Sequence, residues 1–162
     1  IKLTTAEFDA FPGETDIAQK VFGYYYDIGF TNHEIDSLNE EQLTLCLHFI
    51  CEGVIDNSGF YSILLETNGE FDYSKALNRI NDQADKKIFD EIGSIYLDHK
   101  KWFSQGKLPP ILDNDSKEFD EKLSVRIEEL QKEWYANGDT RTELFNKYFK
   151  ENKFSLIEKN DN

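Results

Sequence analysis

Residues 40–70, EEQLTLCLHFICEGVIDNSGFYSILLETNGE, decide the fold of this chain. Leu43, Leu47, Ile50 and Val54 recur every three or four residues, which is the spacing of one face of an α-helix. Further apolar residues between them widen this face well beyond a narrow stripe. Such a broad apolar surface predicts a helix that lies in the middle of a helical domain.

This central helix has predicted ends. Ser37, followed three residues later by Glu40, is typical of a capping box, so we predict a helix from Leu38 to Ile55. The segment Asp56–Gly59 predicts a turn, because Asn and Gly tolerate left-handed backbone angles. A short apolar helix is then predicted over residues 60–66.

The same rules predict helices through most of the chain. The further helices are expected at residues 16–28, 72–80, 82–103, 117–136 and 140–150. Ser116 is the predicted N-cap of the fourth of these, and Pro109-Pro110 marks the loop before it. The chain shows no strand alternation. We therefore predict an all-α, compact single-domain bundle of about six to seven helices over residues 1–152, with a frayed tail at 153–162.

Charge is the outstanding compositional feature. The 162 residues carry a net charge of -14, and residues 1–80 alone hold 14 acidic and 4 basic side chains. Phosphates would be repelled, so direct binding to nucleic acid or to an anionic membrane is disfavoured, and a basic protein partner is expected. No apolar run approaches the roughly 20 residues of a membrane helix, and we expect a cytoplasmic protein. The chain holds no Met, so we expect that Ile1 is not where translation starts.

The sequence offers few residues for catalysis or metal binding. His48 and Glu52 lie one helical turn apart, but two ligands do not make a metal site. Cys46 and Cys51, five residues apart, lie about 140° from each other on a helix, so we expect two buried thiols and no disulfide. No phosphate-binding glycine loop or nucleophile motif occurs. We predict a protein that is not an enzyme and has neither cofactor nor metal.

The central segment resembles a known family. An apolar helix, a turn that often reads Asn-Gly-Gly-Phe and a short aromatic helix ending in Asn-Ser/Thr-Gly are typical of the bacterial DNA-mimic-protein-like domain family, formerly a domain of unknown function. The turn here reads Asn57-Ser58-Gly59-Phe60, and the helix end reads Thr67-Asn68-Gly69. The loop with Pro109-Pro110 and the acidic helix after it are also similar. The resemblance covers about residues 37–150.

The resemblance implies a compact helical bundle in which the motif residues are structural. Gly59 is expected to form the turn and Phe60 to enter the core, with Asn57, Asn68 and Gly69 completing the motif. The family takes its name from a member that imitates DNA with surface carboxylates and occupies a DNA-binding transcription regulator. Carboxylates are not a sequence motif, so this activity is implied for the chain as a whole and for no particular residue.

A DNA mimic must hold carboxylates on a rigid face at a spacing comparable to that of duplex phosphates, which is one charge per about 1.7 Å of axis. Glu118, Glu121 and Glu129 are expected to share a face of the long C-terminal helix. The candidate partner-binding carboxylates are Asp27, Glu34, Asp36, Glu40, Glu41, Glu66, Glu70, Asp72, Glu118, Glu121 and Glu129.

Three functions remain open from the sequence. The chain can be a DNA mimic that occupies a regulator or another nucleic-acid-binding protein. It can instead be an immunity or adaptor protein that binds through an apolar or aromatic patch. An enzyme is the third alternative and requires a pocket with convergent polar groups near His48 or Asn57. The oligomeric state does not follow from the sequence.

Overall fold

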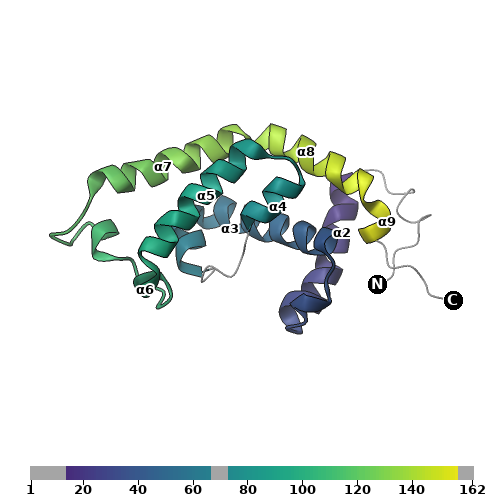
Figure 1. Ribbon diagram of the computed structural model, residues 1–162, viewed down its shortest axis with the longest axis horizontal. Coiled ribbons are helices and arrows are strands. Elements are labelled where there is room, and N and C mark those ends of the chain that lie inside the picture. The colour runs from purple at the N-terminus through teal and green to yellow at the C-terminus, as the bar shows by residue number, and fades with distance from the viewer. Residues whose placement is uncertain (1–13, 67–72, 157–162) are drawn as a thin grey trace.

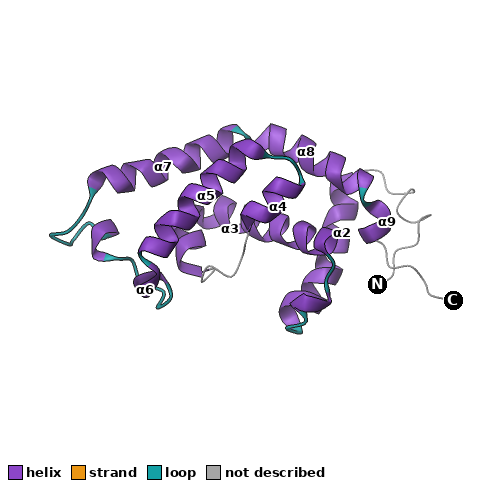
Figure 2. Ribbon diagram, viewed as in Figure 1, coloured by secondary structure: helices purple, strands orange, loops and turns teal. Residues whose placement is uncertain are grey.

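A computed structural model describes residues 14–66 and 73–156. Its described part is helical and contains no strand (Figures 1 and 2), which confirms the predicted all-α bundle. The helices are α2 (Glu14–Tyr26), α3 (Glu40–Glu66), α4 (Tyr73–Arg79), α5 (Gln83–Asp98), α6 (Lys100–Phe103), α7 (Glu121–Ala136), α8 (Gly138–Glu151) and α9 (Lys153–Leu156). A π-helix, η1 (Asp27–Thr31), and two 3₁₀ turns, η2 (Ile35–Ser37) and η3 (Pro110–Leu112), complete the described elements.

The helices pack around α3. This helix contacts α2, α4, α7 and α9, while α5 packs on both α4 and α7. Helices α7 and α8 follow one another along one edge of the molecule in Figure 1. The short helix α6 and the η1–η2 segment project from the opposite edge at separate places. Both projections extend away from the packed body of the molecule.

The predicted inward faces form the core. Leu45, Cys46 and Ile55 of α3 are fully buried, and Trp134 of α7 is buried against Phe60 and Phe89. Because aromatic rings remove large apolar areas from water, this cluster is a major source of stability. It also joins α3, α5 and α7 into one body.

Gly59 breaks α3 into two straight pieces. Its φ of 73° and ψ of -175° are not helical, although the helical hydrogen bonding resumes at once after it. The turn predicted over Asp56–Gly59 is therefore confined to this glycine, because residues 56–58 still belong to the first piece. Phe60 is completely buried immediately after the break. Gly59 therefore makes the break in the helix, and Phe60 lies in the core directly after it.

Both predicted serine caps are wrong. Helix α3 begins at Glu40 behind Asn39, whose Oδ1 accepts from the Gln42 N–H at 2.8 Å while its own N–H donates to Gln42 Oε1 at 3.0 Å. This is a reciprocal capping box, shifted by two residues. The Ser37 hydroxyl instead donates to the Glu34 carbonyl.

Helix α7 begins four residues later than expected. Its cap is Asp120, whose carboxylate accepts from the N–H groups of Lys122 and Leu123 at 2.9 and 3.3 Å. Ser116 is engaged in a local turn, where its hydroxyl accepts from the Glu118 N–H. A carboxylate at the N-cap also interacts favourably with the helix dipole, which explains why Asp120 displaces the serine.

The predicted frayed tail is partly wrong. Residues 153–156 form α9, in which Leu156 is buried and its carbonyl accepts from the Tyr25 hydroxyl at 2.5 Å. The contact ties α9 to α2, which explains why this part of the tail is ordered. Residues 157–162 lie outside the described part. The expected helix over 82–103 is also divided, since α5 ends at Asp98 and α6 starts at Lys100.

Candidate protein-binding surface

Three predicted carboxylates lie together on the η1–η2 projection. Asp27 opens η1, Glu34 precedes η2 and Asp36 lies within it, and all three are exposed. None of them makes an ion pair with another described residue. Tyr26 and Ile35, both 39% exposed, flank them. We call these five residues the acidic patch.

Backbone hydrogen bonds hold the acidic patch rigid. The Asn32 N–H donates to the Asp27 carbonyl at 3.0 Å, and the Glu34 N–H donates to the Ile28 carbonyl at 3.3 Å. Gly29 is buried against Leu38, with so little room that a Cβ would lie 2.6 Å from Leu38 Cδ1. The backbone that carries the carboxylates is therefore fixed relative to α2 and α3, and binding would not require this backbone to become ordered.

Several of the other predicted carboxylates make ion pairs, are partly buried or lie outside the helix that was expected to hold them. Glu40 pairs with Arg79 at 3.0 Å, and Glu129 pairs with Arg126 at 3.4 Å. Glu41 is half-buried. The expected shared face of Glu118, Glu121 and Glu129 is wrong, because Glu118 precedes α7. The Glu66 side chain, Glu70, Asp72, Asn68 and Gly69 lie outside what the structure describes.

The structure also contains a buried ionic network that was not predicted, between α3, α5, α7 and α8. Arg141 of α8 donates through Nη1 to Asp85 Oδ2 at 2.5 Å and through Nε to Glu52 Oε1 at 2.8 Å. Its guanidinium lies 3.4 Å from the centre of the Trp134 ring. Asp85 is fully buried and also accepts from Asn137 Nδ2 at 2.8 Å. The network links α3, α5, α7 and α8, so its position and burial indicate a structural role.

His48 belongs to the edge of this network. Its ring stacks on Phe145 with centroids 3.7 Å apart, and its nitrogens face the Tyr73 hydroxyl at 3.1 Å and Glu52 at 3.3 Å. Burial, and then the positive charge of Arg141, lower the pKa of His48 to about 3. His48 is thus a neutral core side chain at ordinary pH. Cys46 and Cys51 are buried free thiols, as expected, and burial raises the pKa of Cys46 to about 12.

The stability of the fold should depend on the protonation of His48. The unfolded side chain titrates near 6.5, so between about pH 6.5 and pH 3 the unfolded state binds more protons than the folded state. The free energy of unfolding should therefore decrease as the pH falls through this window. Urea unfolding of His48→Gln should show a weaker decrease than the wild type. The matched control is His33→Asn, which changes an exposed histidine whose φ of 60° suits Asn. Equal pH slopes for both variants would contradict this assignment.

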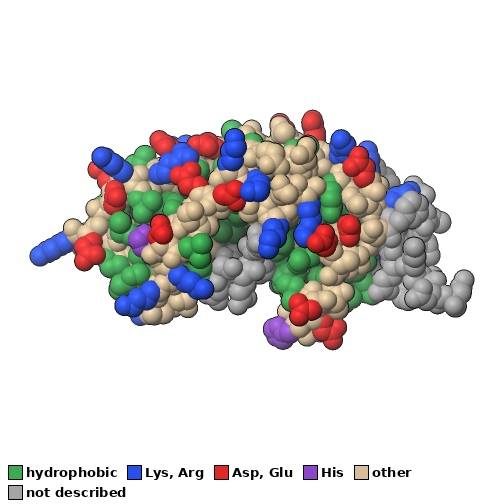
Figure 3. Space-filling model, viewed as in Figure 1, with side chains coloured by type: hydrophobic (Ala, Val, Ile, Leu, Met, Phe, Trp, Pro, Cys, Tyr) green, Lys and Arg blue, Asp and Glu red, His purple; other side chains and the backbone are tan. Residues whose placement is uncertain are grey.

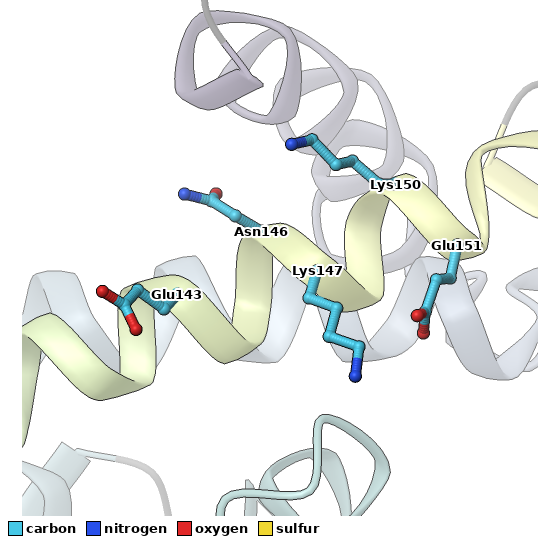
Figure 4. Close-up of a pocket in the computed structure, with 5 residues that line it drawn as sticks. All are labelled: Glu143, Asn146, Lys147, Lys150 and Glu151. Atoms are coloured by element: carbon cyan, nitrogen blue, oxygen red, sulfur yellow. The ribbon is translucent and has the colours of Figure 1, made fainter.

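The described surface has two shallow depressions. The first, of about 390 Å³, is lined by five residues of α8, whose side chains extend to different sides of the helix (Figure 4). The second, of about 490 Å³, lies between α4 and α5 and contains Lys75, Arg79 and Lys86. Arg79 pairs with Glu40, and Lys86 pairs with Asp90. Neither depression brings a described nucleophile beside a histidine, and no described group of three or more His, Cys, Asp and Glu residues could hold a metal ion.

A second candidate binding surface lies around α6 and was not predicted from the sequence. Lys100, Lys101 and Lys107 are exposed and make no ion pair within the described residues. The apolar side chains beside them are Leu97, which is 68% exposed, Trp102 and Leu108. We call these six residues the basic patch. In Figure 3, blue and green side chains gather over α6, whereas red side chains mark the η1–η2 projection.

The comparison with protein families identifies the scaffold. The model of the DMP19-like protein family matches residues 36–152, from η2 to the end of α8. This chain belongs to the DMP19-like family. Comparisons with curated proteins and with solved structures find no match. Helix α2 and four of the five members of the acidic patch, Tyr26, Asp27, Glu34 and Ile35, lie outside the family match. Within the described residues, no helix has the length and apolar character that crossing a bilayer requires.

Proposed function

We propose that this chain is an acidic, non-catalytic protein-binding domain of the cytoplasm that occupies the basic, DNA-binding surface of a nucleic-acid-binding protein. The observation that carries the proposal is the rigid acidic patch, whose three carboxylates have no basic partner among the described residues. No Lys or Arg occurs between Lys20 and Lys75. No basic side chain within this segment can therefore pair with its carboxylates in place of a partner protein.

The physics of DNA binding supports this role. A DNA-binding surface gains much of its affinity from neutralising phosphates and releasing their counterions. Fixed carboxylates attract the same basic side chains and accept charge-assisted hydrogen bonds from them. The family takes its name from a member that imitates DNA, which favours the same kind of partner. Because the attraction is electrostatic, affinity should decrease steeply as salt rises.

The test is capture of partners on the immobilised protein. We expect the wild type to retain a DNA-binding protein at low salt, to release it at high salt and to release it when duplex DNA is added. The variant Asp27→Asn/Glu34→Gln/Asp36→Asn should lose most of this binding. A control with the same change of charge is Asp115→Asn/Glu128→Gln/Glu143→Gln, which alters exposed carboxylates outside both patches that have no ion pair in the described structure.

The control variant should keep the partner, because it leaves the acidic patch unchanged. Equal loss of binding in both variants would contradict the proposal, because it would show that net charge and not the acidic patch determines binding. Binding that neither salt nor duplex DNA affects would contradict it. Unfolding midpoints of all three proteins should agree closely, since surface substitutions of this kind change stability little.

An adaptor or immunity role is the second candidate. It is favoured by Leu97, Trp102 and Leu108, which are exposed in α6 and in the segments on either side of it. Aromatic side chains in the centre of an interface often contribute most of its binding energy. Under this alternative, Trp102→Ala should remove the captured partner while the triple variant of the acidic patch retains it.

A further inference from the structure

We propose that the basic patch of one molecule binds the acidic patch of a second copy, and that two copies make this contact reciprocally in a closed dimer. The inference uses the same acidic patch as the proposed function but does not depend on which partner that patch binds. It follows from the complementary chemistry of the two patches and from their places in the fold.

The two patches match in charge and in apolar character. The acidic patch carries three carboxylates, at Asp27, Glu34 and Asp36, and no Lys or Arg lies within it. The basic patch carries three ammonium groups, and residues 99–112 contain no Asp or Glu. Asp98, at the end of α5, is the one carboxylate within the span of the basic patch, between Leu97 and Lys100. Opposite charges in these two places favour contact between copies and fix its orientation.

Apolar contact adds to the charge complementarity. Seven large hydrophobic side chains are exposed in the described structure, and five of them belong to these two patches. They are Tyr26 and Ile35 in the acidic patch and Leu97, Trp102 and Leu108 in the basic patch. Apolar side chains surrounded by charges are typical of a protein-binding surface. Burying both groups against each other would remove most of the exposed large apolar side chains from water.

The basic patch is as well ordered as the acidic one. Phe103 anchors it in the core, stacked on Tyr96 with ring centroids 5.7 Å apart. The chain then turns back at Gly106, whose φ is 65°, and the Lys107 N–H donates to the Trp102 carbonyl at 3.2 Å. The backbone that carries the lysines, on α6 and on the turn after it, is thus fixed, so little backbone ordering entropy opposes the contact.

The arrangement of the patches allows a closed pair. Helix α6 and the η1–η2 segment project from the same edge of the molecule (Figure 1). A twofold axis beyond this edge places the basic patch of each copy opposite the acidic patch of the other. Such a contact is made twice and closes the assembly, whereas a single contact of unlike surfaces would continue into a chain of molecules.

The net charge of -14 opposes any self-association, but salt limits its range. At about 0.15 M ionic strength the Debye length is about 8 Å, so charges outside the contact are largely screened. Opposite charges within the contact still attract one another. A consequence is that the dimer covers the acidic patch, and self-association then competes with binding of a basic partner.

Charge reversal on purified full-length protein tests the contact. Sedimentation velocity at about 0.15 M salt should show a wild-type dimer that dissociates on dilution. Lys100→Glu/Lys101→Glu/Lys107→Glu and Asp27→Lys/Glu34→Lys/Asp36→Lys should each be monomeric at concentrations where the wild type is dimeric. The control Lys117→Glu/Lys122→Glu/Lys132→Glu, which reverses exposed lysines elsewhere, should remain dimeric. Circular dichroism checks that each variant is folded.

Mixing the two reversed variants is the decisive measurement. In the mixed pair, both contacts again join unlike charges, so a dimer of one copy of each should form. A wild type that is monomeric at every concentration, a dimer that neither reversal weakens, or a mixture that stays monomeric would each overturn the proposal. Assemblies larger than a dimer would overturn its closed form. None of these measurements needs a heterologous partner, so the result is separate from the outcome of the capture experiment.

Discussion

Arg141→Met is expected to lower the free energy of unfolding by about 3–5 kcal/mol, the typical cost of leaving a buried charge without its partner. Asp85 is fully buried, and Arg141 supplies its positive counterpart through the contact at 2.5 Å. The substitution also removes the hydrogen bonds to Glu52 and to the Trp134 carbonyl, at 2.8 and 3.1 Å. Urea denaturation measures the loss.

The protonation state of Arg141 agrees with this structural role. Burial by itself lowers the pKa of Arg141, but the hydrogen bonds that its guanidinium donates to Glu52 and Asp85 more than offset this effect and raise the pKa. The guanidinium is therefore charged at every accessible pH. Arg141→Lys keeps the charge but loses the planar fork that reaches two carboxylates at once, so an intermediate loss is expected. This variant keeps the test informative should Arg141→Met not fold.

Two further variants separate the charge effect from lost packing. Arg126→Met removes an exposed arginine that pairs with Glu91, Glu129 and Glu133, and its effect should be much smaller because solvent screens those pairs. Adding Asp85→Asn to Arg141→Met removes the uncompensated charge and should restore part of the stability. Independent, additive losses in the double variant would show that the pair is not coupled.

The amphipathic patterns predicted the helical scaffold because the helices pack so that their apolar faces are buried, and these faces can be read from the sequence. They could not predict Arg141, although it lies one turn from Phe145 and two turns from Phe149 on the buried side of α8. A charged residue is expected at the surface unless its partner is known. Here that partner, Asp85, is 56 positions away in the sequence. Contacts of this kind depend on the tertiary arrangement and leave no local pattern.

The helix starts show a different limit of sequence reasoning. Ser37 and Asn39 both suit an N-cap, as do Ser116 and Asp120, so local chemistry offers two starts for each helix. In both cases the residue closer to the apolar stripe forms the cap. The acidic patch was only partly predictable because the tertiary structure, and not the local sequence, selects among several suitable residues. The sequence predicts its three carboxylates as candidates, but it does not show which candidates make ion pairs.

Gly59→Ala is expected to lower the free energy of unfolding by about 2–4 kcal/mol. Gly59 has a φ of 73° and a ψ of -175°, a region that is essentially restricted to glycine and costs other residues about 1–3 kcal/mol. A Cβ on Gly59 would also lie 2.5 Å from Gln131 Oε1. That oxygen accepts from the Phe60 N–H at 3.0 Å, so moving it away adds the cost of a lost hydrogen bond, about 0.5–1.5 kcal/mol.

Gly53→Ala is the matched control for Gly59→Ala, because it makes the same change in the same helix. Gly53 is exposed, and a Cβ there meets nothing within 4 Å. Alanine favours a helix interior over glycine, so the control should gain about 0.5–1 kcal/mol. Gln131→Ala added to Gly59→Ala removes the steric contact but leaves the backbone strain, and it should restore little. Full recovery in that double variant, measured by urea denaturation, would show that the side-chain clash and not the backbone conformation requires glycine at this position.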